Sequence, residues 1–189
     1  NVKLDDLLVG DKNAVMMGTR ILGYGSGYNV SVNDPETNEE VELQVDLTTL
    51  KPKEMDEKLL EKGENKFEFE LPNSKRKVEF KLLNGHDEKK IEEALKELEK
   101  VEQLTGVSSE LTTRIKHQLI SVDGNTEQSF IDNFVDNEFL ALDTRAYRKY
   151  VASITPDIDL SFDYRTKGTG KEVKVDVPLG MEFFWPAGE

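Results

Sequence analysis

Three glycines at alternate positions, Gly23, Gly25 and Gly27, have a spacing that could hold phosphate. Glycine loops that hold phosphate lead into the N-terminus of a helix, often with a Lys close by. Here a helical pattern precedes the glycines and a strand pattern follows them. The spacing therefore favours a flexible connection over a phosphate site.

Residue types that bind metals are scarce. The chain has no Cys and two His, His86 and His117, and neither His has carboxylates at the spacing of a metal set. The segment Asp123-Gly124-Asn125 is similar to the start of a calcium loop but lacks the later ligands, so it favours a turn. The acidic hairpin around Asp34 and Glu36 favours a solvated edge, where charge discourages strand pairing. We expect no bound metal and no cofactor.

A basic cluster is the first candidate for binding a partner. Arg145, Arg148 and Lys149 lie close together on a predicted helix of an acidic chain. They could form a docking patch for an acidic partner. The alternative is local ion pairing with acids nearby, which are Asp143, Asp136 and Glu138.

The aromatic end of the chain is the second candidate. Phe183, Phe184 and Trp185 are consecutive, Pro186 follows them, and Trp185 is the only Trp. Chain ends are usually polar and frayed, so an apolar end is expected to be buried. It could dock on the chain's own last hairpin and helices or insert into a neighbouring subunit.

Composition limits the function further. The chain has 189 residues, enough for one domain or two small ones, and a net charge of −13. This charge disfavours binding to nucleic acid or to an anionic membrane surface. No apolar run reaches the length of about 20 residues that spans a bilayer. No Ser/His/Asp set or nucleotide motif can be assembled either, so we expect no enzyme activity.

Hydrophobic periodicity predicts short helices and hairpins, an α+β fold described as a short helical bundle with two or three β-hairpins. Alternating residues predict three hairpins, each with a turn cluster between its strands: 28–33 with 40–47, 67–71 with 78–82, and 158–164 with 172–179. Helical spacing predicts helices over 11–22, 87–104, about 109–119, 126–135 and 137–152. Asp11 is the expected N-cap of the first helix, and Leu140, Thr144, Tyr147 and Val151 are the expected inward residues of the last.

An internal repeat is also predicted. One constant shift along the chain, which we call the repeat shift, places Glu40-Val41 on Glu172-Val173. The same shift places helix over helix and hairpin over hairpin. We therefore expect residues 11–47 and 143–179 to share one geometry. Three segments follow: 1–50 as the tail of a first unit whose N-terminal part is missing from the sequence, 51–66 as a charged linker, and 67–189 as a second unit.

Several short segments together resemble the baseplate hub subunit family of T-even-like tailed bacteriophages. The segments are Asp11 to Arg20 with Gly23-Tyr24-Gly25, Val45-Asp46-Leu47, Phe69-Glu70-Leu71-Pro72, Phe80-Lys81-Leu82-Leu83, Ser121-Val122-Asp123-Gly124, Pro156-Asp157-Ile158-Asp159, and Pro178-Leu179 with Phe183-Phe184-Trp185-Pro186. The chain is also similar to a phage baseplate hub assembly catalyst. The resemblance extends over essentially the whole chain.

The resemblance implies a non-enzymatic virion protein of the tail baseplate, present in the host cytoplasm during assembly. Its partners would be other baseplate hub proteins and the tape-measure protein, and a homo-oligomer is compatible with it. The alternative is a transient assembly chaperone for the hub or the tape-measure protein. Relatives carry a Cys-Pro-x-Cys knuckle at hairpin tips where this chain has Asp34-Pro35-Glu36-Thr37, which implies zinc-ribbon-like hairpins lacking metal.

Overall fold

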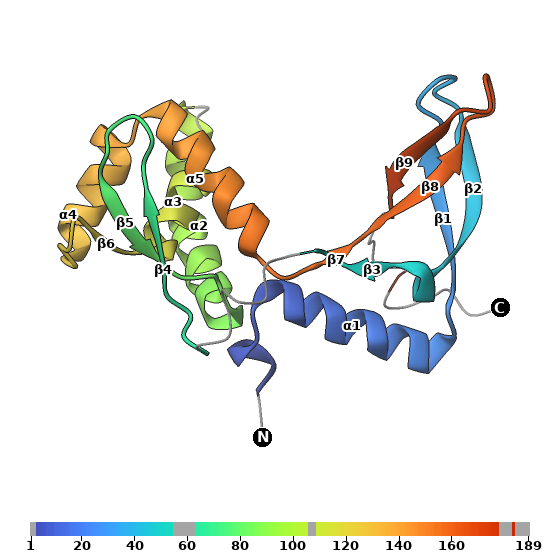
Figure 1. The fold of residues 1–189 in the computed structure, drawn as a ribbon, viewed down its shortest axis with the longest axis horizontal. Coiled ribbons are helices and arrows are strands. Elements are labelled where there is room, and N and C mark those ends of the chain that lie inside the picture. The colour runs from blue at the N-terminus through green and yellow to red at the C-terminus, as the bar shows by residue number, and fades with distance from the viewer. Residues whose placement is uncertain (1–2, 55–62, 106–108, 178–182, 184–189) are drawn as a thin grey trace. The chain divides into compact units, whose positions relative to one another are not determined.

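The computed structural model describes residues 3–54, 63–105, 109–177 and 183, with the backbone alone for 99–105. The chain forms two compact units, and its fold is α+β (Figure 1). Unit 1 contains Asn1–Val9 and Met55–Thr155, and unit 2 contains Gly10–Glu54 and Pro156–Glu189. These boundaries differ from those of the three predicted segments, 1–50, 51–66 and 67–189. Unit 2 combines the first and the last hairpin, because their apolar side chains share one core. Half of the predicted linker, residues 55–62, lies outside the described residues.

Unit 1 contains a three-stranded antiparallel sheet in the order β4-β5-β6. Its strands are β4 (Phe67–Glu70), β5 (Lys77–Phe80) and β6 (Leu119–Val122). The hairpin of β4 and β5 confirms the alternating pattern. Strand β6 replaces the end of a predicted helix: Leu119 pairs with Phe80, and the sheet buries the side chain of Leu119. A pairing partner distant in sequence therefore overrides local helical spacing.

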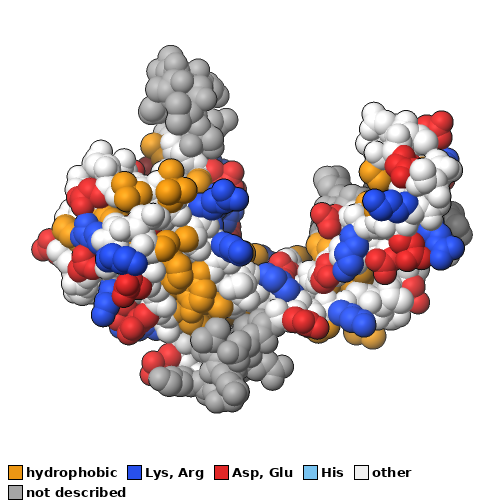
Figure 2. Space-filling view, turned by 45° about the horizontal axis from the view of Figure 1, so that its top comes forward, with side chains coloured by type: hydrophobic (Ala, Val, Ile, Leu, Met, Phe, Trp, Pro, Cys, Tyr) orange, Lys and Arg blue, Asp and Glu red, His pale blue; other side chains and the backbone are white. Residues whose placement is uncertain are grey.

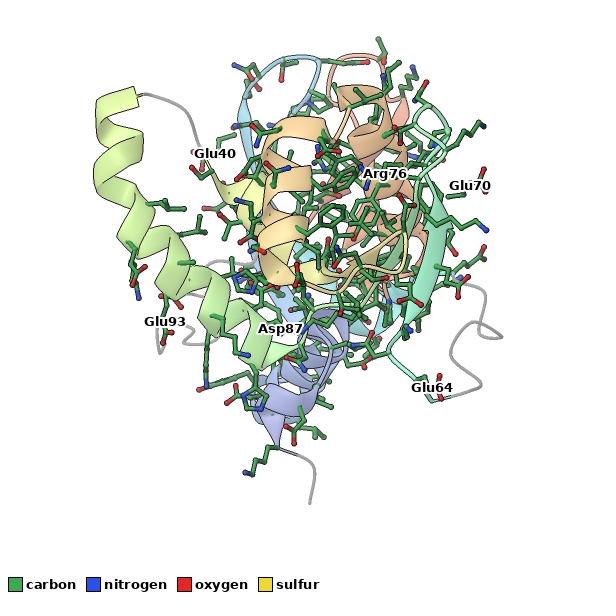
Figure 3. The ribbon with its side chains drawn as sticks, turned by 90° about the vertical axis from the view of Figure 1, so that its left-hand side faces the viewer. Glu40, Glu64, Glu70, Arg76, Asp87 and Glu93 are labelled. Carbon is green, nitrogen blue, oxygen red and sulfur yellow. The ribbon has the colours of Figure 1, made fainter. Side chains whose placement is uncertain are left out.

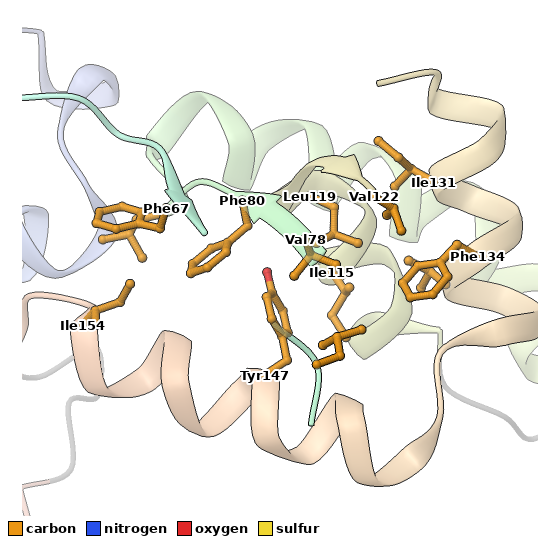
Figure 4. Close-up of a cluster of buried hydrophobic side chains, with 13 residues drawn as sticks. Phe67, Val78, Phe80, Ile115, Leu119, Val122, Ile131, Phe134, Tyr147 and Ile154 are labelled. Atoms are coloured by element: carbon orange, nitrogen blue, oxygen red, sulfur yellow. The ribbon is translucent and has the colours of Figure 1, made fainter. Parts of the chain in front are cut away.

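Unit 1 also contains helices, most of which bury apolar side chains in the same core as this sheet. They are α2 (Gly85–Thr105), α3 (Glu110–Gln118), α4 (Gln128–Asn133), which continues into a π-helical turn (Phe134–Glu138), and α5 (Ala141–Ile154). Figure 4 shows Tyr147 projecting from α5 toward Phe80, and the two rings meet edge to face with centroids 5.2 Å apart. Figure 3 shows that the C-terminal part of α2 extends away from the rest of unit 1.

Unit 2 consists of one helix and two hairpins around a second core. Its elements are α1 (Val9–Tyr24, beginning at the last residue of unit 1), β1 (Gly27–Asn33), β2 (Glu40–Asp46), β3 (Lys51–Pro52), β7 (Ile158–Asp159), β8 (Ser161–Arg165) and β9 (Glu172–Asp176). The alternation in β1 places Tyr28, Val30 and Val32 in the core. The short strands β3 and β7 pair, which joins the two distant parts of the chain.

Two details of the predicted helices are wrong. Helix α1 begins at Val9, so Asp11 lies in its first turn and is not the N-cap. The Val9 N–H instead donates to the Leu83 carbonyl, which fixes the start of the helix through a contact distant in sequence. Leu140 precedes α5 and is 51% exposed, although the spacing placed it inward. Tyr147 is fully buried, as expected.

The hairpins β1-β2 and β8-β9 have the register that the repeat shift predicts. Val30 pairs with Leu43, and Phe162 pairs with Val175. Their turns agree as well: the Asp34 N–H donates to the Glu39 carbonyl, and the shifted pair Thr166 and Lys171 makes the same bond. The first residues of helices α1 and α5, Val9 and Ala141, are also related by the repeat shift.

Candidate partner-binding surface

Helix α5 presents a row of cations on its outer face. Its helical period turns Asp143 and Tyr147 inward, where both are fully buried, and leaves Arg145, Arg148 and Lys149 exposed. These three cations border a groove of about 500 Å³ between α3 and α5, which we call the α3–α5 groove. Its lining consists of Leu83, Leu111, Arg114, Ile115, Gln118, Arg145, Arg148, Lys149, Val151 and Ala152.

The acids near the basic cluster are bound elsewhere. Asp136 pairs with Lys116 at 2.7 Å, and Glu138 pairs with Arg76 at 2.6 Å. The alternative of local ion pairing is therefore wrong for the acids that the sequence singles out. Among the residues that the structure describes, Arg145, Arg148 and Lys149 form no ion pair. Figure 2 shows Lys and Arg side chains beside hydrophobic ones on unit 1.

Asp143 anchors α5 to the turn between β4 and β5. Its carboxylate accepts hydrogen bonds from the backbone N–H groups of Asn73 at 2.7 Å and Ser74 at 3.0 Å, and from the Asn73 side chain at 2.9 Å. Burial raises the pKa of the Asp143 carboxyl, but these hydrogen bonds outweigh burial and hold the pKa below its ordinary value. The cation row is thereby held on a fixed helix.

The aromatic end is only partly within the described residues. Phe183 is buried in the core of unit 2, with 1% of its surface exposed. Its ring meets Tyr28 edge to face, with centroids 5.2 Å apart. Phe184, Trp185 and Pro186 lie outside the described residues. A role of these four residues in binding a partner stays a prediction.

The tips of the two hairpins in unit 2 are joined by a set of polar contacts, which we call the tip clasp. Asp34 lies at its centre and is fully buried. Its Oδ1 accepts from the N–H groups of Glu36 and Thr37 within its own turn. Its Oδ2 accepts from the Tyr164 hydroxyl and from the Lys167 N–H across the gap, both at 2.7 Å.

Both carboxylate oxygens of Asp34 accept two hydrogen bonds each in the tip clasp. The hydrogen bond from the Lys167 N–H is the largest cause that holds the pKa of the Asp34 carboxyl well below its ordinary value, against the opposing effect of burial. Glu36 adds a second link, because its carboxylate accepts from the N–H and the hydroxyl of Thr169. The expectation of a solvated acidic edge is therefore wrong for Asp34. The signal in the sequence is the Asp34-Pro35 pair that opens the turn, because Asp side chains in turns accept from nearby backbone N–H groups.

The remaining candidates for chemistry are the glycine-rich turn and the histidines. Gly25 has a positive φ of 83° and Gly27 begins β1, so the glycines turn the chain from helix to strand. His86 contacts Asp6 at the surface. Over the described ranges, no group of three or more His, Asp or Glu side chains is arranged to hold a metal. None of the helices in those ranges is both long and apolar enough to span a membrane.

The chain was compared with protein families, curated proteins and solved structures. No curated protein matches the chain, and no solved structure does. The family model described as T4 bacteriophage base plate protein matches residues 1–185. Nearly the whole chain is covered, so this protein belongs to the T4 bacteriophage base plate protein family.

Proposed function

We propose that the protein is a structural subunit of the baseplate hub that acts through contacts with other proteins and catalyses no reaction. Family membership supports a baseplate role, and the resemblance of the segments quoted above supports the hub. Its partners would be other hub proteins and the tape-measure protein.

The observation that carries the proposal is the α3–α5 groove. The groove places an apolar floor beside three cations that form no ion pair with any described residue, on a chain with a net charge of −13. Contacts with a partner would cover the apolar floor and neutralise the cations. The aromatic end would contribute a second contact if residues beyond Phe183 reach a neighbour.

Mass spectrometry of purified virions against infected-cell lysate tests this proposal. We expect the protein in virions at a fixed ratio to other baseplate proteins. Its presence in lysate but not in virions would instead support a transient assembly chaperone.

A complementation assay connects the groove to assembly. The variant R145E/R148E/K149E should fold normally but reduce the yield of infectious particles in a host that lacks the wild-type gene. The control K12E/K51E/K171E makes the same change of charge on unit 2, and we expect it to complement normally. Equal yields from the two variants would contradict a role of the groove.

A further inference from the structure

We infer that the α3–α5 groove binds an acidic amphipathic helix of a neighbouring baseplate protein. This inference rests on the proposed function and specifies the partner segment that the groove would take. Three properties of the groove support it: its apolar floor, the elements that form its walls, and the uneven distribution of its charges.

The floor can bury apolar side chains of a partner. Leu111 is 39% exposed, and the half-buried Val151 faces the same groove. Ile115 lies beneath them and is 2% exposed, so the floor is continuous with the core of unit 1. Partly exposed side chains above a packed core can bury further apolar area without rearrangement.

The walls favour a helix as the occupant. Helices α3 and α5 form them, and their backbone groups are used within each helix. An extended segment needs a strand edge to pair with, and no β-strand contributes a residue to the described lining. A helix needs only side-chain contacts, and its ridges fit the groove between two other helices.

The charges favour acidic residues on one side of that helix. On the α3 wall Arg114 is already bound, at 2.7 Å to Glu88 and at 3.2 Å to Glu110. On the α5 wall Arg145 and Lys149 are four residues apart, which is one helical turn or about 6 Å along the axis. Glu or Asp residues one turn apart on the partner would face them. The partner helix is therefore acidic toward α5 and apolar toward the floor.

A peptide of defined sequence tests this inference with the full-length protein. The probe is a fluorescein-labelled helix-forming peptide of about five turns with Leu on one face and Glu on the other, and fluorescence anisotropy measures its Kd. Two control peptides replace all Glu by Lys, or all Leu by Ser. We expect the probe to bind and both controls to bind about tenfold more weakly or not at all.

Variants of the protein locate the binding. R145E/R148E/K149E should raise the Kd of the probe about tenfold or more, and Leu111→Ser about fivefold. The matched control K12E/K51E/K171E should change the Kd less than about twofold, because its substitutions lie outside the groove. Far-UV circular dichroism of each variant confirms that it is folded.

Four outcomes would overturn the inference. The first two are that the probe does not bind the wild type, or that the control peptide with Ser in place of Leu binds as tightly as the probe. The third is that the probe binds R145E/R148E/K149E as tightly as the wild type. The fourth is that the wild type self-associates and this variant does not. The last outcome would assign the groove to a second copy of the chain. Each of them leaves the virion measurement untouched, so the inference can fail while the hub proposal stands.

Discussion

Asp143 and Asp34 show how single buried carboxylates organise this molecule. Each accepts hydrogen bonds from a hairpin turn and connects that turn to a segment distant in sequence. Charge-assisted bonds to backbone N–H groups are strong, and a buried N–H group left without an acceptor is costly. Each carboxylate therefore fixes the position of a turn.

Asp143→Ala should destabilise unit 1. Three donors would lose their acceptor, so we expect the free energy of unfolding to fall by on the order of 2–4 kcal/mol. Urea denaturation followed by circular dichroism measures the change. The control is Asp136→Ala, which removes an exposed acid with one ion pair and should cost less than about 1 kcal/mol. Equal effects of the two substitutions would refute the anchoring role.

Tyr164 should make unit 2 sensitive to alkali. Its hydrogen bond to Asp34, together with burial, raises the pKa of Tyr164 to about 12 from an ordinary value of 10.0. Because the folded pKa is the higher one, its contribution to stability is complete below about pH 10 and is lost as the pH rises toward 12. An absorbance titration of tyrosinate should show one group near pH 12 that Tyr164→Phe removes.

The same titration has an internal control. Asp34→Asn removes the negative charge beside the hydroxyl and should move the pKa of Tyr164 back toward its ordinary value. A titration curve that Tyr164→Phe leaves unchanged in the alkaline range would show that the hydrogen bond does not persist in solution.

At the scale of elements, three hairpins share the same turn geometry. In each hairpin the first turn residue donates its N–H to the carbonyl five residues later and accepts from the N–H four residues later. The residue in the fifth position has a positive φ, and it is Asn38, Lys75 or Gly170. The turn clusters of the sequence predict these hairpins well, because turn formation depends on local residues.

Two of the three glycines in helix α1, Gly10 and Gly18, have opposite requirements. A Cβ at Gly10 would lie 1.6 Å from the Pro156 carbonyl oxygen, whereas a Cβ at Gly18 would have nothing within 4 Å. Gly10→Ala should therefore lower the free energy of unfolding by on the order of 2–4 kcal/mol, through displacement of the backbone. Gly18→Ala should raise it by up to about 1 kcal/mol. Chemical denaturation compares them, and the same sign for both changes would contradict this packing.

The sequence predicted those parts of the fold that depend on residues close together in the chain, and missed those that depend on distant ones. Alternation and helical spacing identified the hairpins and the long helices, because both are local patterns. Strand β6 was missed because Leu119 continues a helical spacing and becomes a strand only through Phe80. The buried positions of Asp34 and Asp143 depend on donors in distant parts of the chain. The sequence therefore predicted a solvated edge around Asp34 and offered Asp143 as an ion-pair partner of the basic cluster. The cation row was predicted, but its groove required the packing of α3 against α5.

At the scale of the whole molecule, the chain end completes a core. Phe183→Ala should lower the free energy of unfolding of unit 2 by about 3 kcal/mol, because it removes a buried ring that contacts Tyr28. The control Leu22→Ala changes a side chain that is 91% exposed and should alter stability by less than about 0.5 kcal/mol. Thermal denaturation of the two variants measures the difference. An unchanged melting temperature for Phe183→Ala would mean that the end docks elsewhere in solution.

The division of unit 2 between the two ends of the chain has a consequence for biosynthesis. Residues 10–54 leave the ribosome before Met55–Thr155, and β8, β9 and Phe183 are made after both. The apolar face of β1 and β2 therefore stays uncovered until β8, β9 and Phe183 have been made, whereas unit 1 can already fold. A chain truncated after Thr155 should show a protease-resistant unit 1 and a sensitive first hairpin. Until β8, β9 and Phe183 have been made, the apolar face of that hairpin stays exposed to solvent and available to a chaperone.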